Sequence, residues 1–228
     1  MEHTVQRGYD LGRESLKWLA IATMTIDHVG VVLYPENIVL RYIGRLSFPL
    51  IAYLLMLGLE STRNAKNYLT RLLLFALISQ VPFYLARGVL PWEYLNIFFT
   101  LSLGVLFIYF FERNNYIFLI PLVASAVLPL DFDGYGIATI GCFYALRKNK
   151  RIGIVLFILL NLFIFFDLPY QSLALLALPL ILLHNDGRFP LNKISVKTDY
   201  PPWRKYFFYI YYPLHLLVLY FLKIEFYS

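Results

Sequence analysis

The chain has 228 residues, of which 60% are hydrophobic and 15% are charged, and its mean hydropathy is +0.63. A soluble domain of this size would be far more polar, so the composition excludes a soluble protein and predicts an all-α integral membrane protein. The net charge is +6, but the basic residues stand in short segments between apolar runs, where they set membrane orientation. We therefore expect no nucleic-acid partner.

Apolar runs recur along the whole chain and predict a polytopic helical bundle with about nine transmembrane spans. In chain order the predicted spans are 16–34, 41–60, 67–86, 95–111, 116–130, 135–147, 152–166, 170–184 and 206–223. They leave no room for a soluble domain, so residues 1–228 are expected to form a single membrane domain.

The loop charges predict the orientation of the bundle. With the N-terminus in the cytoplasm, every Lys and Arg except Arg41, Arg45, Arg87 and Lys223 lies on the cytoplasmic side. An excess of basic residues in short cytoplasmic loops is the main determinant of membrane topology. We therefore expect a cytoplasmic N-terminus, an external C-terminus, and a multi-pass protein surrounded by membrane lipids.

The first predicted span carries Lys17 near its start and the ionisable pair Asp27 and His28 past its middle. Ionisable residues at this depth are costly and mark a functional site by default. Lys17 and His28 are eleven residues apart, so they share one helix face and lie about 16 Å apart along its axis. A neutral imidazole tolerates burial and can act as a general base, which makes His28 a catalytic candidate. Asp27 is a second catalytic candidate because it is also ionisable and lies at the same depth. The structural alternative is a core histidine that bonds to a neighbouring helix.

Arg41 and Arg45 open the second predicted span on the side of the membrane toward which Asp27 lies. An Asp–Arg pairing between the first two spans would satisfy charges that are otherwise costly to bury. Such pairing can be purely structural or can contribute to substrate binding. Both arginines are therefore candidate substrate-binding residues.

The last predicted span contains His215, preceded by Tyr212, Pro213 and, eleven residues upstream, Arg204. The spacing of a surface cation and a deep histidine thus occurs twice, although helices that start in the cytoplasm often begin with a basic residue. A proline inside a helix frees carbonyl groups of the preceding turn. We expect His215 to share a polar cavity with His28 as a catalytic residue, and Tyr212 to contact substrate.

Arg71 lies near the start of the third predicted span, on the same side as Lys17 and Arg204. Together these three cations can form a phosphate-binding mouth for a cofactor. The alternative is that they only follow the charge rule for cytoplasmic segments.

The remaining candidates are weaker patterns. Asn96, Asp133 and Tyr135 are candidate substrate contacts near the external ends of later spans, where bonds between helices or a plain turn fit equally well. Cys142 is the single cysteine and has no partner at metal-ligand spacing, so we expect no metal site.

Several stretches of the chain resemble the TraX family. They are LKWLAIATMTIDHVGVVLYP, LRYIGRLSFPLIAYLLMLGLESTRN, YLTRLLLFALISQVPFYLA, LNIFFTLSLG and FFYIYYPLHLLVLY, in this order. The family is named for an inner-membrane protein of conjugal transfer that acetylates the amino terminus of pilin. It is similar to a wider group of transmembrane acyltransferases, in which a Lys or Arg followed after ten residues by His is a hallmark. Lys17 and His28 match that spacing, and GRLSFPLIAYLL resembles the second-helix signature of the group.

The resemblance implies an acetyl-CoA-dependent acetyltransferase of the bacterial cytoplasmic (inner) membrane, with His28 as the base and Lys17 in contact with CoA. The acceptor would be an external amine or hydroxyl of a peptide, glycan or lipid. Direct transfer and a covalent acetyl-histidine both remain open. Two other classes compete: a proton-coupled transporter or channel with Asp27, His28 and His215 as a relay, and a non-catalytic membrane adaptor.

Overall fold

The computed structural model describes residues 10–90, 92–166, 168–193 and 202–227, with the backbone alone at 192, 193 and 202–205. All regular elements of this described part are helices, joined by turns and loops, and Leu95 and Leu130 form an isolated bridge. Its helices are α1 (Leu11–Val32), α2 (Ile38–Gly44), α3 (Ser47–Ser61), α4 (Ala65–Arg87), α5 (Ile97–Phe111), η1 (Tyr116–Phe118), α6 (Leu119–Val127), α7 (Asp133–Lys148), α8 (Lys150–Phe165), η2 (Pro169–Leu176), α9 (Ala177–Asn185), η3 (Pro190–Lys193) and α10 (Pro202–Tyr227). The all-α prediction is confirmed for these residues.

Each predicted span coincides with one helix or with two consecutive helices. The second span, predicted as 41–60, consists of α2 and α3 with a break at Arg45 and Leu46. Pro49 explains this break, because proline has no N–H to bond the carbonyl of Arg45 and its ring clashes with that carbonyl. The break separates Arg41 and Arg45 from the rest of the span.

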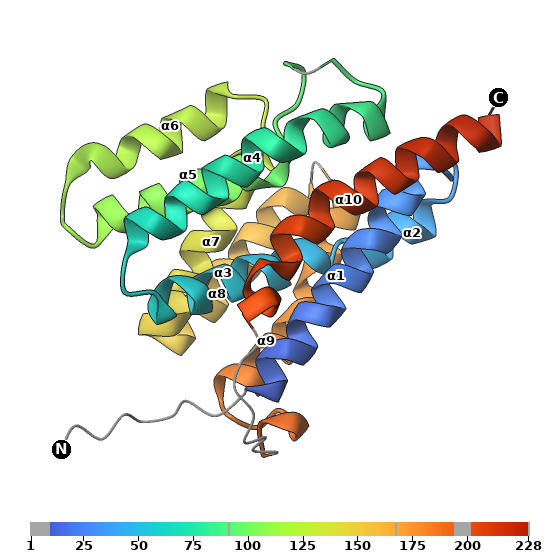
Figure 1. The fold of residues 1–228 in the computed structure, drawn as a ribbon. Helices are drawn as coiled ribbons and strands as arrows, with labels where there is room; N and C mark the ends of the chain where they lie inside the picture. The colour runs from blue at the N-terminus through green and yellow to red at the C-terminus, as the bar shows by residue number, and fades with distance from the viewer. Residues whose placement is uncertain (1–9, 91, 167, 194–201, 228) are drawn as a thin grey trace.

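Helices α1, α4 and α10 run in the same direction, so their C-terminal ends lie at the same end of the bundle (Figure 1). The hydroxyl of Tyr227 at the end of α10 donates to the carbonyl of Leu33 at the end of α1, at 2.7 Å. The end of α4 joins them, since a Cβ placed on Gly88 would lie 3.2 Å from Nζ of Lys223. Gly88 ends α4 with a φ of 70°, a left-handed conformation that glycine adopts without strain.

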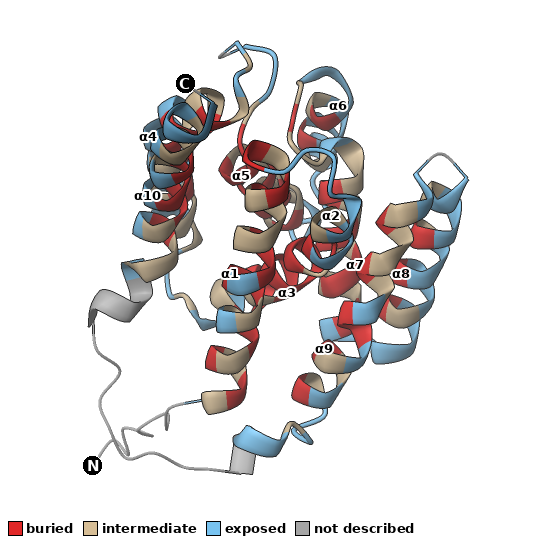
Figure 2. Ribbon diagram, turned by 90° about the vertical axis from the view of Figure 1, so that its right-hand side faces the viewer, coloured by how far each residue is buried: buried red, intermediate tan, exposed pale blue. Residues whose placement is uncertain are grey.

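Helix α3 lies at the centre of the bundle and is buried along most of its length (Figure 2). Phe48, Leu50 and Tyr53 are at most 1% exposed, and α3 packs against both α1 and α7. A helix that is apolar on all sides must be covered by other helices or by lipid. The central position of α3 leaves α4, α8 and α10 on the outside, where they expose many large apolar side chains.

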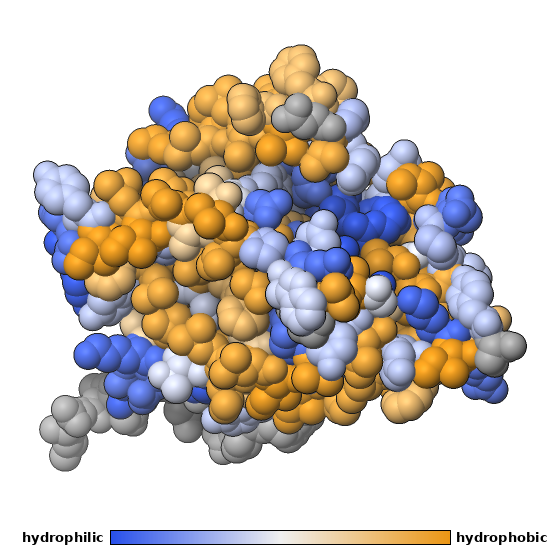
Figure 3. Space-filling model, turned by 90° about the horizontal axis from the view of Figure 1, so that it is seen from above, coloured by the Kyte–Doolittle hydropathy of each residue, from blue (hydrophilic) through white to orange (hydrophobic). Residues whose placement is uncertain are grey.

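Three helical segments of the described residues are long and apolar enough to cross a membrane. They are Ile38–Ser61, Ala65–Arg87 and Tyr206–Tyr227, with 24, 23 and 22 residues. Seen from above, much of the surface is hydrophobic, and hydrophilic residues gather near its centre and along its edges (Figure 3). Such continuous apolar surface is typical of a membrane protein. The count of nine spans and the orientation of the termini stay predictions.

Candidate functional site

The first and last helices meet at two buried histidines. Nδ1 of His28 in α1 lies 2.8 Å from Nε2 of His215 in α10, and each residue is 7% exposed. Tyr212 packs edge-on against both rings, with centroid distances of 6.0 Å to His28 and 5.5 Å to His215. Tyr211 stacks on His215 and its hydroxyl lies 2.7 Å from Oγ1 of Thr25. The two histidines, which the sequence predicts to share a polar cavity, are therefore in direct contact.

The backbone determines which ring nitrogens of this pair carry protons. Nδ1 of His215 lies 3.0 Å from the carbonyl oxygen of Tyr211, which can only accept a hydrogen bond. Neutral His215 therefore holds its proton on Nδ1, and its Nε2 accepts the proton of His28 Nδ1–H. Nε2 of His28 then carries a lone pair, and it has no hydrogen-bond partner among the described residues. A free lone pair on a fixed imidazole is what a general base requires.

Asp27 pairs with both arginines that follow the first helix. Its Oδ2 accepts from Nη1 of Arg41 at 2.6 Å, and its Oδ1 accepts from Nη2 of Arg45 at 2.9 Å. Arg45 also donates to the carbonyl of Arg41 and to Oε1 of Gln171. The predicted Asp–Arg pairing between the first two spans is therefore present. Each carboxylate oxygen of Asp27 accepts a hydrogen bond from an arginine. These ion pairs explain why a charged residue is present at this depth, and they do not require a catalytic role for Asp27.

Gly44 makes the close pairing of α1 and α2 possible. A Cβ at this position would lie 2.0 Å from Oδ1 of Asp27, well inside any real contact distance. The Gly44–Arg45 dipeptide thus supplies both the space for the Asp27 carboxylate and one of its partners.

A second ion pair lies beside the first at this end of the bundle. Nη1 of Arg87 in α4 donates to Oδ1 of Asp131 at 2.8 Å. Asp131 also interacts electrostatically with Asp27, Arg41 and Arg45. His28 in turn lies within electrostatic reach of the three arginines. The histidine pair therefore borders a cluster of alternating charges.

The cations predicted to bind a cofactor lie at the opposite end, within the first two turns of α1, α4 and α10. Lys17 is 3.9 Å from Oε2 of Glu14 and 6.0 Å from the ring centroid of Phe207. Nε of Arg71 is buried without a hydrogen-bond partner in the described part of the chain. The side chain of Arg204 lies outside the described residues.

The predicted substrate contacts differ in their surroundings. Asn96 caps α5, accepting from Phe98 N–H, and donates to Gln80 and to the carbonyl of Ala76, so its side chain is fully used by the fold. We found no interaction between this side chain and the histidine pair in the described residues. The substrate-binding prediction for Asn96 stays untested.

The other three predicted contacts lie on α7 and α10. Asp133 starts α7, is exposed, and has a φ of 38°, which is unusual for a residue with a side chain. The hydroxyl of Tyr135 donates to Oδ1 of Asn161 at 3.1 Å and joins α7 to α8. The hydroxyl of Tyr212 is buried and unpaired within the described residues, beside the histidine pair. Of the three, Tyr212 alone touches both histidine rings.

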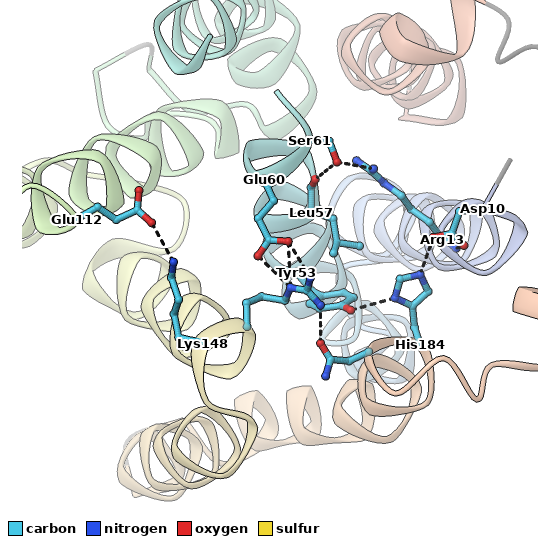
Figure 4. A network of polar contacts seen from close by, with 11 residues as sticks. Asp10, Arg13, Tyr53, Leu57, Glu60, Ser61, Glu112, Lys148 and His184 are labelled. Carbon is cyan, nitrogen blue, oxygen red and sulfur yellow. Dashed lines mark hydrogen bonds and ion pairs between the residues drawn. The ribbon is translucent and has the colours of Figure 1, made fainter. Parts of the chain in front are cut away.

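A polar network that the sequence analysis missed closes the end of the bundle near the start of α1 (Figure 4). His184 at the end of α9 lies 2.9 Å from the hydroxyl of Tyr53 and 3.2 Å from Oδ2 of Asp10. This hydrogen bond to His184 holds the pKa of Asp10 below its usual value. Arg147 binds Glu60 through two nitrogens in the same network. The sequence feature that could have indicated this network is His184, a histidine at the end of an apolar run.

The described residues contain no group of three or more His, Cys, Asp and Glu side chains that could hold a metal ion. A cavity of about 720 Å³ lies between α5, α6, α7 and α8 and has mostly apolar walls. Neither histidine of the buried pair lines it. The candidate site is therefore the histidine pair between two charged ends of the bundle.

Comparison with known proteins gives one family and two relatives. The family described as TraX protein matches residues 12–223. The probable fimbrial assembly protein FimC, serogroup H1, of Dichelobacter nodosus is 26% identical, over 94% of this chain and 97% of its own length. The uncharacterized protein RP591 of Rickettsia prowazekii (strain Madrid E) is 33% identical, over 45% of this chain and 38% of its own length. No solved structure matches the chain.

Proposed function

This chain belongs to the TraX family, and from that premise we propose that it is a multi-pass acetyltransferase of the bacterial inner membrane. It transfers acetyl groups from cytosolic acetyl-CoA to an amine or hydroxyl on the external side. The observation that carries the proposal is the unpaired Nε2 of His28, oriented by His215 in the interior of the bundle. The name of the fimbrial assembly relative favours a pilin-like peptide amine as the acceptor.

The cytoplasmic end of the bundle suits the phosphates of CoA. Arg13 and Arg71 both act electrostatically on the hydroxyl of Tyr68, and Lys17 lies near Arg13 on the same helix. The buried Nε of Arg71 lacks a partner in the described residues, and a phosphate oxygen would supply one. Lys17 lies on the same face of α1 as His28, three turns before it. This basic end fits an anionic nucleotide.

Acetyl-CoA supplies the acetyl group as a reactive thioester. Nε2 of His28 takes the proton of the acceptor amine or hydroxyl while the nucleophile bonds to the thioester carbonyl carbon. The hydroxyl of Tyr212 donates to the carbonyl oxygen, on which negative charge develops. When the carbon–sulfur bond breaks, His28 returns the proton to the leaving sulfur. His215 keeps the His28 ring in place throughout through their hydrogen bond.

The first test measures CoA release by the full chain in nanodiscs, with labelled acetyl-CoA. His28→Gln keeps most of the volume of the side chain but removes the base, so acetyl-CoA binding is retained and turnover is lost. Lys17→Ala is expected to weaken binding of acetyl-CoA. If His28→Gln keeps wild-type turnover, or the wild type does not bind acetyl-CoA, the proposal fails.

A second test separates the nucleotide from the thioester. Arg71→Gln is expected to raise the KM for acetyl-CoA about tenfold, because a charge-assisted hydrogen bond to phosphate contributes roughly 1.5–3 kcal/mol. The same variant should leave the KM for S-acetyl-pantetheine, which lacks the nucleotide, unchanged. Arg63→Gln, an exposed arginine on the same side, is the matched control. Equal effects on both donors would exclude a phosphate contact at Arg71.

A further inference from the structure

Three of the four basic residues that the sequence places on the external side converge in the structure. Arg41, Arg45 and Arg87 lie together with Asp27 and Asp131, and we call these five residues the outer arginine cluster. The electrostatic interactions join both ion pairs into one unit, because Arg41 acts on Arg87 and Asp131 as well as on its own partners. Three guanidinium groups face two carboxylates, so the cluster has one positive charge in excess.

Two of the arginines keep unused donors. Arg45 is 9% exposed in its side chain and donates through all three of its nitrogens. Arg41 and Arg87 are 27% and 24% exposed, and each donates through Nη1 alone among the described residues. A guanidinium has five N–H donors in a planar fork that matches carboxylate and phosphate oxygens. The excess positive charge of the cluster is therefore found where Arg41 and Arg87 have accessible N–H donors.

A buried amide beside the cluster also has a donor without a hydrogen bond of normal geometry within the described part of the chain. Gln171, 5% exposed, accepts from Arg45 through Oε1, while its Nε2, near the hydroxyl of Tyr135, makes no such bond. A buried donor without a partner is costly, and a ligand oxygen would satisfy it. Because Gln171 contacts Arg45, this donor lies beside the free arginine donors.

We propose that the outer arginine cluster binds an oxyanion, a carboxylate or phosphate, that the acceptor carries beside its nucleophilic amine or hydroxyl. The role in acceptor selection rests on the proposed acetyl transfer, whereas anion binding itself does not. Tyr212 joins the two places, because its ring touches both histidines and its hydroxyl interacts with Arg87. An acceptor anchored at the cluster thus presents its nucleophile toward His28.

The binding test uses inorganic phosphate and acetate as probes on the full chain in nanodiscs, without acetyl-CoA. At constant ionic strength and up to ~100 mM anion, one or both probes should raise the thermal midpoint of the wild type. The increase should be lost in Arg41→Gln and Arg87→Gln and kept in Arg87→Lys. Arg113→Gln is the control, because Arg113 is an exposed arginine that follows the C-terminal end of α5 and does not belong to the cluster. No increase in the wild type, or an equal increase in all variants, overturns the proposal.

The acceptor test compares matched amines with acetyl-CoA as donor. Phosphoethanolamine is paired with ethanolamine, and alanine with alaninamide, so the two arms separate phosphate from carboxylate. One anionic member should show a kcat/KM about tenfold or more above its neutral partner, and the ratio should fall toward one in Arg87→Gln. Equal rates within both pairs overturn acceptor selection. Arginine-dependent anion binding with no acetyl transfer to any amine supports the anion site and overturns the proposed function instead.

Discussion

Nδ1 of His28 lies 2.8 Å from Nε2 of His215, although 187 residues separate them in the chain. The contact joins α1 to α10, and the carbonyl of Tyr211 fixes its direction by holding Nδ1–H of His215. One backbone oxygen thereby sets the proton positions of two rings. The second histidine thus orients the first, in the way that a buried acceptor orients the histidine of a hydrolase triad.

Replacing His215 should impair the chemical step more than donor binding. In His215→Ala, Nδ1–H of His28 loses its acceptor and the ring can adopt the wrong tautomer or orientation. We expect kcat to fall about 10- to 100-fold with little change in the KM for acetyl-CoA. Steady-state kinetics of CoA release provide the measurement.

His215→Gln separates orientation from packing. Its amide oxygen can accept from Nδ1–H of His28, so this variant should recover much of the activity lost in His215→Ala. If both variants lose activity equally while remaining folded, His215 acts by another route. If neither loses activity, the pair has no catalytic role.

The sequence predicts the helices well, because apolar length is visible without knowledge of the packing. Each apolar run lies on a helix or on two consecutive helices, and the second run still forms one candidate span, Ile38–Ser61, although Pro49 breaks its helix at Arg45 and Leu46. The pairing of Asp27 with Arg41 and Arg45 was also predictable, because adjacent spans must satisfy their charges locally.

Contacts between distant helices could not be predicted in the same way. The sequence shows that His28 and His215 are deep, but the packing of α1 on α10 decides that their rings touch. Likewise, Gln171 and Asp131 are far apart in the sequence. They lie near Arg45 only because several helices pack together at this end of the bundle. These residues carry no local pattern that marks them.

Gly44→Ala should destabilise the protein. The new Cβ would lie 2.0 Å from Oδ1 of Asp27, so α1 and α2 must separate or the ion pairs must break. Overpacking of this kind costs about 1–3 kcal/mol. The apparent thermal midpoint in detergent is expected to fall.

Gly141→Ala is the matched control for this prediction. Gly141 also lies inside a helix, α7, but its added Cβ would meet Cε1 of Phe107 at an ordinary 3.5 Å. This variant should be neutral or stabilising by up to ~1 kcal/mol, since alanine favours helix over glycine. A Gly44→Ala protein as stable as Gly141→Ala would show that the helices tolerate the extra methyl group.

The contact between Asp10 and His184 predicts a pH dependence of stability. The hydrogen bond to His184 lowers the pKa of Asp10 in the folded protein. The stabilisation is therefore present above the unfolded pKa, about 3.9, and is lost as the pH falls through the lower folded value. Asp10→Asn keeps an oxygen that can cap α1 but removes the charge. The wild type should melt higher than this variant at pH 6, with the difference vanishing in acid; a constant difference would contradict the charge-based explanation.

The predicted orientation places the outer arginine cluster outside the cell, and cysteine labelling can test it. In a Cys142→Ala background, cysteines are introduced at Glu36, after α1, and at Lys66, at the start of α4; both positions are exposed. A membrane-impermeant maleimide applied to intact spheroplasts should label Glu36→Cys, whereas Lys66→Cys should react only after permeabilisation. The reversed pattern would place the cluster in the cytoplasm. An acceptor anchored there would then have to be cytosolic, because Arg41 and Arg87, which are 27% and 24% exposed, lie at that same end of the bundle.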